Sequence, residues 1–255
     1  MAIALRATRL RCRGEGRSGA ADCVEISLSE QGSVRARSVV IAAGARYRRP
    51  ELRDRASFEG SSLHYWASPA EAKLSAGEEV ALVGGGNSAG QAAVSLAAHV
   101  KHLTMVVRGE GLEASMSRYL IYRIKMLENV DMVAGSEVVA LQGEGPGRLQ
   151  AVTIRDRASG TTRLLPARQL FLFIGAEPNT AWLDGCVALD EKGYVLTGAS
   201  PQMTACVPHE LQTSMPGVFA IGDVRSGSTK RVASAVGEGA AVVAQIHSFL
   251  GSSNT

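Results

Sequence analysis

The chain has 255 residues, of which 45% are apolar and 20% are charged, and its formal net charge is +3. This apolar content excludes a disordered protein and suffices for one large core or two modest ones. The small charge disfavours nucleic acid as a partner, although arginines are frequent near the N-terminus.

The first forty residues predict short strands joined by tight turns. Alternating apolar and polar residues occur around residues 3–5 and 24–28, and Gly32 supplies a turn before a third strand near Val34. This pattern indicates a β-meander. It is followed by a continuous apolar run from Val39 to Ala43 that ends at Gly44, and such a run predicts a strand covered on both faces.

From Glu79 the pattern becomes strand, glycine turn, helix and strand. The predicted strands cover residues 80–83 and 103–107, and an alanine-rich helix reaches residue 98, which together form one βαβ unit. A second helix is predicted with Ser115 as its N-cap. Its buried face is expected to carry the apolar residues at helical spacing, namely Met116, Leu120, Ile121, Ile124 and Leu127.

Strands are predicted around residues 130, 138, 152 and 164, and an apolar run follows at 170–174. The chain is then rich in loops until a strand at 218–221 and a final helix from about Arg231 to Leu250. The inner side of that helix is expected to carry Val232, Val236, Val243, Ile246 and Leu250.

The glycine turn has the pattern G-x-G-x-x-A between a predicted strand and a predicted helix. Gly84 permits the tight turn, Gly86 lets the backbone approach a diphosphate, and Ala89 lets helix and strand pack closely. The phosphates would bind the free N–H groups of the helix start, at Asn87 and Ser88. An ordinary glycine-rich turn is the alternative, but the strand and helix context favours a nicotinamide dinucleotide.

The end of the following strand distinguishes NAD from NADP. An acidic residue there would hold the ribose hydroxyls of NAD, but the strand ends at Val107 and Arg108, and no acid follows until Glu110. Because a guanidinium can pair with a 2′-phosphate, Arg108 favours NADPH. Alternatively, Arg108 is a solvated charge at a strand end.

The segment Thr213–Asp223 reads T-S-x-P-G-V-F-A-x-G-D and resembles the flavin-binding signature of the pyridine nucleotide-disulfide oxidoreductases. The resemblance implies that Gly222 lets the backbone approach FAD and that Asp223 hydrogen-bonds the ribityl chain. Residues 41–44, which include Ala43 and Gly44, resemble the second FAD motif of the family. Residues 173–179, which include Ile174 and Gly175, resemble the segment that leaves the nucleotide domain.

The G-G-G-N-S-A string narrows the resemblance to the thioredoxin-reductase-like branch. This branch implies that Arg231, Val232 and Ala233 lie beside the flavin ring, where a helix N-terminus would stabilise negative charge on the reduced ring. The implied fold is α/β, with two Rossmann-like, three-layer (ββα) domains. Its NAD(P) domain, residues 63–177, would be inserted into an incomplete FAD domain formed by residues 1–62 and 178–255, and the branch implies a homodimer.

The sequence departs from that branch at two decisive places. Trp66 and Pro69 stand where the redox C-x-x-C is expected, and neither can form a disulfide, so no catalytic side chain is expected. We expect Trp66 to be a packing residue. The glycine motif for the ADP half of FAD is also missing from residues 1–40, so we expect either an N-terminally truncated chain or a flavin domain completed by another subunit.

The resemblance implies an FAD-dependent NAD(P)H oxidoreductase in which hydride passes from nicotinamide C4 to flavin N5. Electrons would then reach an external acceptor such as a ferredoxin-like protein, a quinone or a disulfide. The alternatives are a non-catalytic NAD(P)-binding regulatory module and a fragment of a thioredoxin-disulfide reductase homologue. NADH stays an alternative to NADPH, because Gly109 and Glu113 replace further expected arginines and leave Arg118 as a substitute.

No membrane segment is predicted, since no apolar run approaches roughly 20 residues, and no signal peptide, since the first residues lack its apolar core and small-residue cleavage site. We therefore expect a cytoplasmic protein without membrane contact. The four cysteines lie far apart, which suits a reducing compartment; they are Cys12, Cys23, Cys186 and Cys206. No metal site is expected, because neither pair with three-residue spacing has a companion pair. Those pairs are His99 with His102 and Cys206 with His209.

Overall fold

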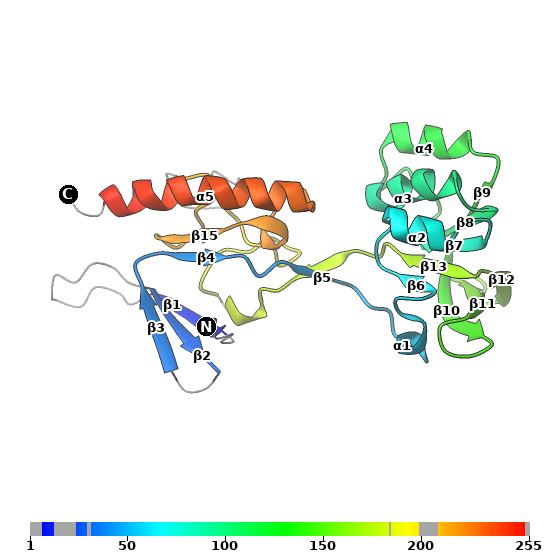
Figure 1. The fold of residues 1–255 in the computed structure, drawn as a ribbon, viewed down its shortest axis with the longest axis horizontal. Helices are drawn as coiled ribbons and strands as arrows, with labels where there is room; N and C mark the ends of the chain where they lie inside the picture. The colour runs from blue at the N-terminus through cyan, green and yellow to red at the C-terminus, as the bar shows by residue number, and fades with distance from the viewer. Residues whose placement is uncertain (1–6, 13–23, 30–31, 184, 199–208, 253–255) are drawn as a thin grey trace. The chain divides into compact units, whose positions relative to one another are not determined.

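The computed structural model describes residues 7–12, 24–29, 32–183, 185–198 and 209–252 (Figure 1). The chain forms two α/β units. Unit 1 consists of Met1–Arg46 and Ala176–Thr255, and unit 2 of Tyr47–Gly175. The units meet in sequence at the short strands β5 (Ala45–Tyr47) and β14 (Ala176–Pro178), which pair with each other.

Unit 2 begins at Tyr47, which is earlier in the sequence than the predicted domain boundary after residue 62. Residues 47–62 belong to unit 2 because the short helix α1 (Arg55–Phe58) inserts Phe58 into its core, where this side chain is 6% exposed. The second boundary, at Gly175, lies two residues from the predicted one at 177, since 177 − 175 = 2.

Unit 2 is built on a five-stranded parallel sheet in the order β6-β13-β7-β8-β9. The strands are β6 (Leu63–His64), β7 (Glu79–Val83), β8 (His102–Val106), β9 (Val130–Val133) and β13 (Gln169–Leu172). β7 lies between β8, which follows it through one helix, and β13, which arrives 86 residues later, since 169 − 83 = 86. Strands that follow β7 in sequence are therefore added on both of its sides, which makes the carboxyl end of β7 a topological switch point. Open α/β sheets bind ligands at such a point.

The sheet of unit 2 is covered on both faces (Figure 1). Helices lie on one face: α2 (Pro69–Leu74), α3 (Asn87–Ala97) and α4 (Arg118–Lys125). An antiparallel sheet lies on the other: β10 (Ser136–Gly143), β11 (Leu149–Asp156) and β12 (Thr162–Pro166). Two cores result, one around Leu96 and Leu103 under the helices and one around Ile154 and Leu170 under the antiparallel sheet. The predicted βαβ unit and three-layer arrangement are confirmed here.

The N-cap of helix α4 (Arg118–Lys125) lies two residues after the predicted one, Ser115. The N-cap is Ser117, because the preceding segment forms a turn in which the Met116 N–H donates to the Leu112 carbonyl at 2.9 Å. The predicted buried face is otherwise correct, since Met116, Leu120, Ile121 and Ile124 are each at most 7% exposed and Leu127 is half-buried.

Unit 1 contains an antiparallel meander of β1 (Ala7–Cys12), β2 (Val24–Leu28) and β3 (Gly32–Ala36), as predicted from residue 24 onward. Residues 3–5 lie outside the described residues. A second sheet pairs β4 (Val39–Ile41) in parallel with β15 (Val218–Ala220), and the long helix α5 (Val232–Ser252) follows. Short 3₁₀ turns, η1 (Ala181–Leu183) and η2 (Gly222–Val224), complete the described part.

Two predictions about burial in unit 1 are wrong. Val40 is 37% exposed although Val39 and Ile41 are buried, because the described residues cover only one face of β4. In α5 the side chains of Val232, Val236 and Val243 are exposed, and the buried position is Val242. Apolar residues stand on more than one side of this helix, so periodicity alone could not choose between the neighbours Val242 and Val243.

No helix among the described residues combines the length and the apolar character needed to cross a membrane. The described residues also contain no cluster of three or more His, Cys, Asp or Glu side chains suited to a metal ion, and Cys206 lies outside them.

Candidate functional site

The glycine turn lies between β7 and α3, at the carboxyl edge of the parallel sheet. Gly84 has φ +144°, a conformation that L-residues rarely adopt, and a Cβ atom there would lie 2.6 Å from the Phe173 carbonyl oxygen. Only glycine fits this contact. The turn therefore presses against the segment after β13 and is fixed at the switch point of the sheet.

Gly86 is the N-cap of α3 and leaves the start of this helix open. Its backbone is extended (φ −90°, ψ 177°), no side chain caps the helix, and a Cβ atom at Gly86 would find its nearest neighbour, the Ser115 carbonyl oxygen, at 3.9 Å. The N–H groups of a helix's first turn have no intrahelical acceptor. Here they belong to Asn87, Ser88 and Ala89, and such N–H groups can bind an anion such as a diphosphate.

Small residues let α3 approach its neighbours. Ala89 is fully buried, and a Cβ atom at Gly90 would lie 2.7 Å from the sulfur of Met116. The first turn of α3 thus packs directly against both the sheet and the segment that leads into α4. The role predicted for Ala89, close packing of helix and strand, agrees with its burial.

The segment before α4 is tied to the glycine turn by two hydrogen bonds. The Ser115 hydroxyl donates to the Gly85 carbonyl at 2.8 Å, and the Ser117 N–H donates to Asn87 Oδ1 at 2.8 Å. The Asn87 side chain therefore binds the segment before α4, and its backbone N–H is left for a ligand. The Ser88 side chain is exposed. Ser115, predicted as a helix cap, instead orients the glycine turn.

Arg108 lies two residues beyond the end of β8, after the buried Val107, and is exposed. The Arg157 guanidinium, from the turn between β11 and β12, donates to the Arg108 carbonyl oxygen at 3.2 Å. Nearby, Arg155 donates to Glu137 at 2.6 Å. This hydrogen bond lowers the pKa of Glu137, against an opposing effect of burial and with further lowering by the charges of Arg155, Arg157 and Arg108. The positive charges of three arginines thus act on this carboxylate, and Arg155 is the one hydrogen-bonded to it.

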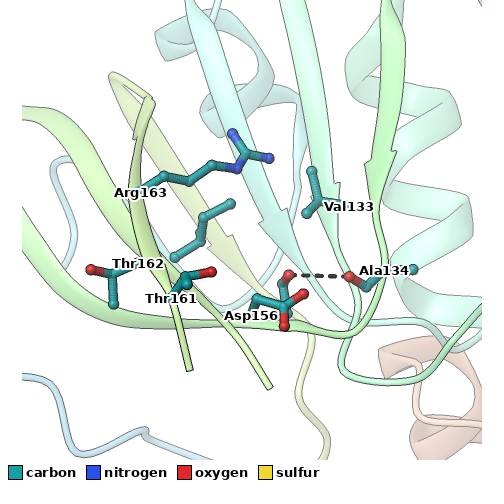
Figure 2. A pocket seen from close by; sticks show the side chains of 8 residues that line it. Val133, Ala134, Asp156, Thr161, Thr162 and Arg163 are labelled. Carbon is teal, nitrogen blue, oxygen red and sulfur yellow. Dashed lines mark hydrogen bonds between the residues drawn. The ribbon is translucent and has the colours of Figure 1, made fainter. Parts of the chain in front are cut away.

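A pocket of about 240 Å³ lies between β9 and the antiparallel sheet (Figure 2). Its lining residues are Val133, Ala134, Ser136, Ile154, Asp156, Thr161, Thr162 and Arg163. The Asp156 carboxylate accepts hydrogen bonds from the Ala158 and Ser159 N–H groups, so it closes its own turn. No lining residue comes from the glycine turn or from α3, so this pocket is separate from the diphosphate position.

In unit 1 the segment after β4 is joined to the returning chain. Gly44 has φ +65°, and Asn179 both donates its side-chain amide to the Ala43 carbonyl at 2.8 Å and its backbone N–H to the Gly44 carbonyl at 3.0 Å. Two segments predicted as separate motifs are therefore held side by side. Ile174 and Gly175 precede this contact in unit 2, where Ile174 is half-buried and Gly175 has φ +97°.

Gly222 and Asp223 form the turn η2 at the end of β15. Gly222 is buried with φ +71°, and its N–H donates to Glu238 Oε2 of α5 at 2.6 Å. Burial would raise the pKa of Glu238, but hydrogen bonds from Arg225 and from the Gly222 N–H outweigh it and hold this pKa below its ordinary value. Asp223, the next residue of the same turn, is half-buried.

Sequence reasoning missed Glu238. The available signal was one carboxylate within a helix made almost entirely of apolar and small residues. Arg231, Val232 and Ala233 are exposed at the start of α5, and the Arg231 carbonyl accepts the Ala235 N–H at 3.1 Å. The N-terminal turn of α5 is therefore at the surface of unit 1.

The sequence profile of the pyridine nucleotide-disulphide oxidoreductases matches residues 12–239 of the chain. The chain belongs to this family. A component of the alkyl hydroperoxide reductase of Pseudomonas putida is 32% identical over 216 residues, which are 85% of the chain and 39% of that protein. An NADH dehydrogenase of Bacillus subtilis is 28% identical over 219 residues, 86% of the chain and 40% of that protein. The chain thus spans about two fifths of the length of these relatives.

Thioredoxin reductase of T. acidophilum is similar in structure, with a TM-score of 0.69 and 26% identity over 96% of the chain and 73% of that structure. The predicted resemblance and the α/β fold with Rossmann-like domains are therefore confirmed. The family implies binding of a flavin and of a pyridine nucleotide. It comprises oxidoreductases, which agrees with the names of both relatives.

The segment Trp66–Pro69, where the C-x-x-C is expected, leads into helix α2. Pro69 is the first residue of α2, and a capping box joins Ser68 and Glu71 across the helix start. The indole N–H of Trp66 donates to Glu71 at 3.1 Å, and the Trp66 side chain is 52% exposed. The Trp66 ring also lies beside Tyr47, with ring centroids 6.2 Å apart, so Trp66 packs at the surface and not in the core.

Proposed function

We propose that the chain is the hydride-transfer part of an FAD-dependent NAD(P)H oxidoreductase. Unit 2 would bind the pyridine nucleotide, and unit 1 would hold the flavin. The observation that carries the proposal is the start of α3, where no side chain caps the helix N-terminus and a Cβ atom at Gly86 would have no neighbour closer than 3.9 Å. Family membership supplies the flavin as the second cofactor.

When bound, the flavin supplies the chemistry by accepting a hydride from the reduced nicotinamide. The chain's own residues would bind and orient. The N–H groups of the first turn of α3 hold the diphosphate, and Gly84 keeps the turn against the sheet. Gly222 gives the ribityl-binding turn its left-handed backbone, and Asp223 supplies a carboxylate there. Hydride transfer requires orientation and electrostatics but no side-chain acid or base.

The electrons would then leave for an external acceptor. Trp66 and Pro69 occupy the positions of the expected dithiol, and neither side chain can carry electrons as a disulfide. An acceptor outside the chain follows from this chemistry. A ferredoxin-like protein, a quinone or a separate disulfide each meets the requirement.

We propose NADPH as the preferred nucleotide because Arg108 stands where an acidic residue would select NAD. Two further arginines, Arg155 and Arg157, act together with Arg108 on the carboxylate of Glu137. The similarity to a protein named NADH dehydrogenase favours NADH instead, so the choice needs a direct comparison of the two nucleotides.

A non-catalytic NAD(P)-binding module is a second candidate. It is favoured by unit 1, in which β4 has only β15 as a parallel neighbour among the described residues and Val40 is 37% exposed. A flavin domain with a half-covered sheet offers less of the surface that encloses a cofactor. In this alternative, unit 2 would sense the nucleotide and unit 1 would contact a partner.

The two candidate functions predict different absorption spectra for the purified chain. The full chain is purified and its absorption recorded before and after anaerobic addition of NADPH. The oxidoreductase predicts a flavin absorption band that NADPH bleaches, whereas the module predicts colourless protein that still binds NADPH. Protein that shows neither flavin nor nucleotide binding would contradict both candidates.

A further inference from the structure

The turn between β11 and β12 lies against the end of β8, although the two segments are far apart in sequence. The Gly135 N–H donates to the Gly109 carbonyl at 2.9 Å, and the Arg157 N–H donates to the Gly135 carbonyl at 2.8 Å. The Arg157 guanidinium reaches the Arg108 carbonyl at 3.2 Å. Backbone hydrogen bonds, and not only a flexible side chain, therefore place Arg157 beside Arg108.

This corner of unit 2 contains three arginines, of which Arg155 forms an ion pair. Arg155 is paired with Glu137 at 2.6 Å, whereas no ion pair of Arg108 or Arg157 occurs within the described residues. Both side chains are exposed. Arg157 uses one N–H of its guanidinium on the Arg108 carbonyl, which leaves most of its five donors for a ligand.

The position has a known chemical meaning in a βαβ unit that binds a dinucleotide. The adenosine ribose lies at the end of the second strand, where an acid selects a 2′-hydroxyl and an arginine accommodates a 2′-phosphate. A phosphate ester carries nearly two negative charges near neutral pH, and guanidinium groups bind such an anion through paired N–H donors. Two guanidinium groups match this charge better than one.

We propose that Arg157 and Arg108 together bind the 2′-phosphate of NADPH, so that Arg157 is a second determinant of nucleotide specificity. This inference rests on the proposed function of unit 2. It adds a residue from the antiparallel sheet to a site otherwise formed by the βαβ unit. In sequence Arg157 follows Arg108 by 49 positions, since 157 − 108 = 49, so no local motif announces it.

A structural role for Arg157 is the rival explanation, because its hydrogen bond could simply hold the segment after β8. The two roles differ in which nucleotide they affect. Loss of a side chain that binds the 2′-phosphate weakens the binding of NADPH and leaves the binding of NADH unchanged, since NADH has no 2′-phosphate. Loss of a structural contact weakens both nucleotides to the same degree.

The test is a calorimetric titration of the full chain with NADPH and with NADH, for the wild type, Arg157→Met, Arg157→Lys and Arg108→Met. Arg168→Met is the matched control, because Arg168 is exposed in the same unit but its N–H donates to the Glu79 carbonyl at the opposite edge of the sheet. Arg157→Met and Arg108→Met should each weaken NADPH about tenfold and NADH less than about twofold. Arg157→Lys should recover part of the loss, and Arg168→Met should have no effect.

Four results are decisive. Equal weakening of NADPH and NADH in Arg157→Met, or unchanged NADPH affinity, would overturn the assignment of Arg157. Selective weakening of NADPH in both Arg108→Met and Arg157→Met supports it. If the wild type binds neither nucleotide, the proposed function of unit 2 fails, and this outcome differs from a failure of the Arg157 assignment alone.

Discussion

Units 1 and 2 use the same local device, a parallel strand followed by a glycine turn, but they enclose it differently. In unit 2, β7 has parallel neighbours on both sides and layers on both faces, and Leu82 is fully buried. In unit 1, β4 has one parallel neighbour among the described residues, and Val40 is 37% exposed. Unit 2 thus supplies the complete support of its own site, whereas unit 1 presents its motif residues on a sheet covered on one face.

The two units can be followed separately because each contains one of the two tryptophans of the chain, Trp66 in unit 2 and Trp182 in unit 1. When one of them is replaced by Phe, the remaining tryptophan fluorescence comes only from the other unit. Urea unfolding of such single-tryptophan proteins gives the free energy of unfolding of each unit.

The largest effect is expected for Gly84→Ala. The positive φ and the 2.6 Å approach of the new Cβ to the Phe173 carbonyl should lower the free energy of unfolding of unit 2 by about 3–5 kcal/mol. Trp66 fluorescence in urea measures it. Gly109→Ala is the control within unit 2, because its φ is not positive and a Cβ atom there has no neighbour closer than 3.7 Å, so its effect should stay below about 1 kcal/mol. Equal stability of both variants would show that the glycine turn is not constrained.

The next largest effect compares neighbouring residues of β4. Ile41→Ala should destabilise unit 1 by about 3 kcal/mol because this side chain is 1% exposed. Val40→Ala should cost less than about 1 kcal/mol, because water already reaches Val40. Trp182 fluorescence reports both values. Similar large losses for the two variants would mean that the outer face of β4 is covered in solution, which would remove the contrast between the units.

Glu238→Gln tests how the turn η2 of unit 1 is held. The folded-state pKa of Glu238 lies below its ordinary value, so its ionised form adds stability that is present above the unfolded pKa and is lost as the pH falls through the folded one. The variant should be less stable by about 2 kcal/mol at neutral pH, since Arg225 loses its charged partner. Trp182 unfolding curves should converge for wild type and variant in acid. A pH-independent difference would contradict the role of this carboxylate.

The smallest effect concerns the segment that orients the glycine turn. Ser115→Ala removes the hydrogen bond to the Gly85 carbonyl and should destabilise unit 2 by about 1 kcal/mol. Ser117→Ala is the control in the same segment, because this N-cap hydroxyl makes no capping hydrogen bond. A loss in Ser117→Ala as large as that in Ser115→Ala would assign the effect to helix α4 instead of the turn.

The sequence predicted unit 2 more completely than unit 1 for physical reasons. The run of strand, G-x-G-x-x-A and helix is a local pattern, and its strands are buried on both faces, so periodicity and composition agree there. In unit 1 the covering of β4 and the choice between Val242 and Val243 depend on tertiary neighbours, which leave no periodic signal. The predicted exposures failed at these positions.

The candidate site shows the same division. Gly84, Gly86 and Ala89 followed from local spacing, because each acts through backbone geometry or small size. Ser115 and Arg157 reach the site from distant segments through hydrogen bonds to carbonyl oxygens. Such contacts depend on how the antiparallel sheet and the segment before α4 pack onto the βαβ unit, and no residue pattern encodes them.

The most direct measurement is the amide NMR spectrum of the full chain during titration with NADPH. If the first turn of α3 binds the diphosphate, the amide resonances of Asn87, Ser88 and Ala89 shift in saturable fashion and do so more than those of the opposite sheet edge, including Arg168. Saturable binding that leaves these three amides unshifted, or the absence of any binding, would contradict the account.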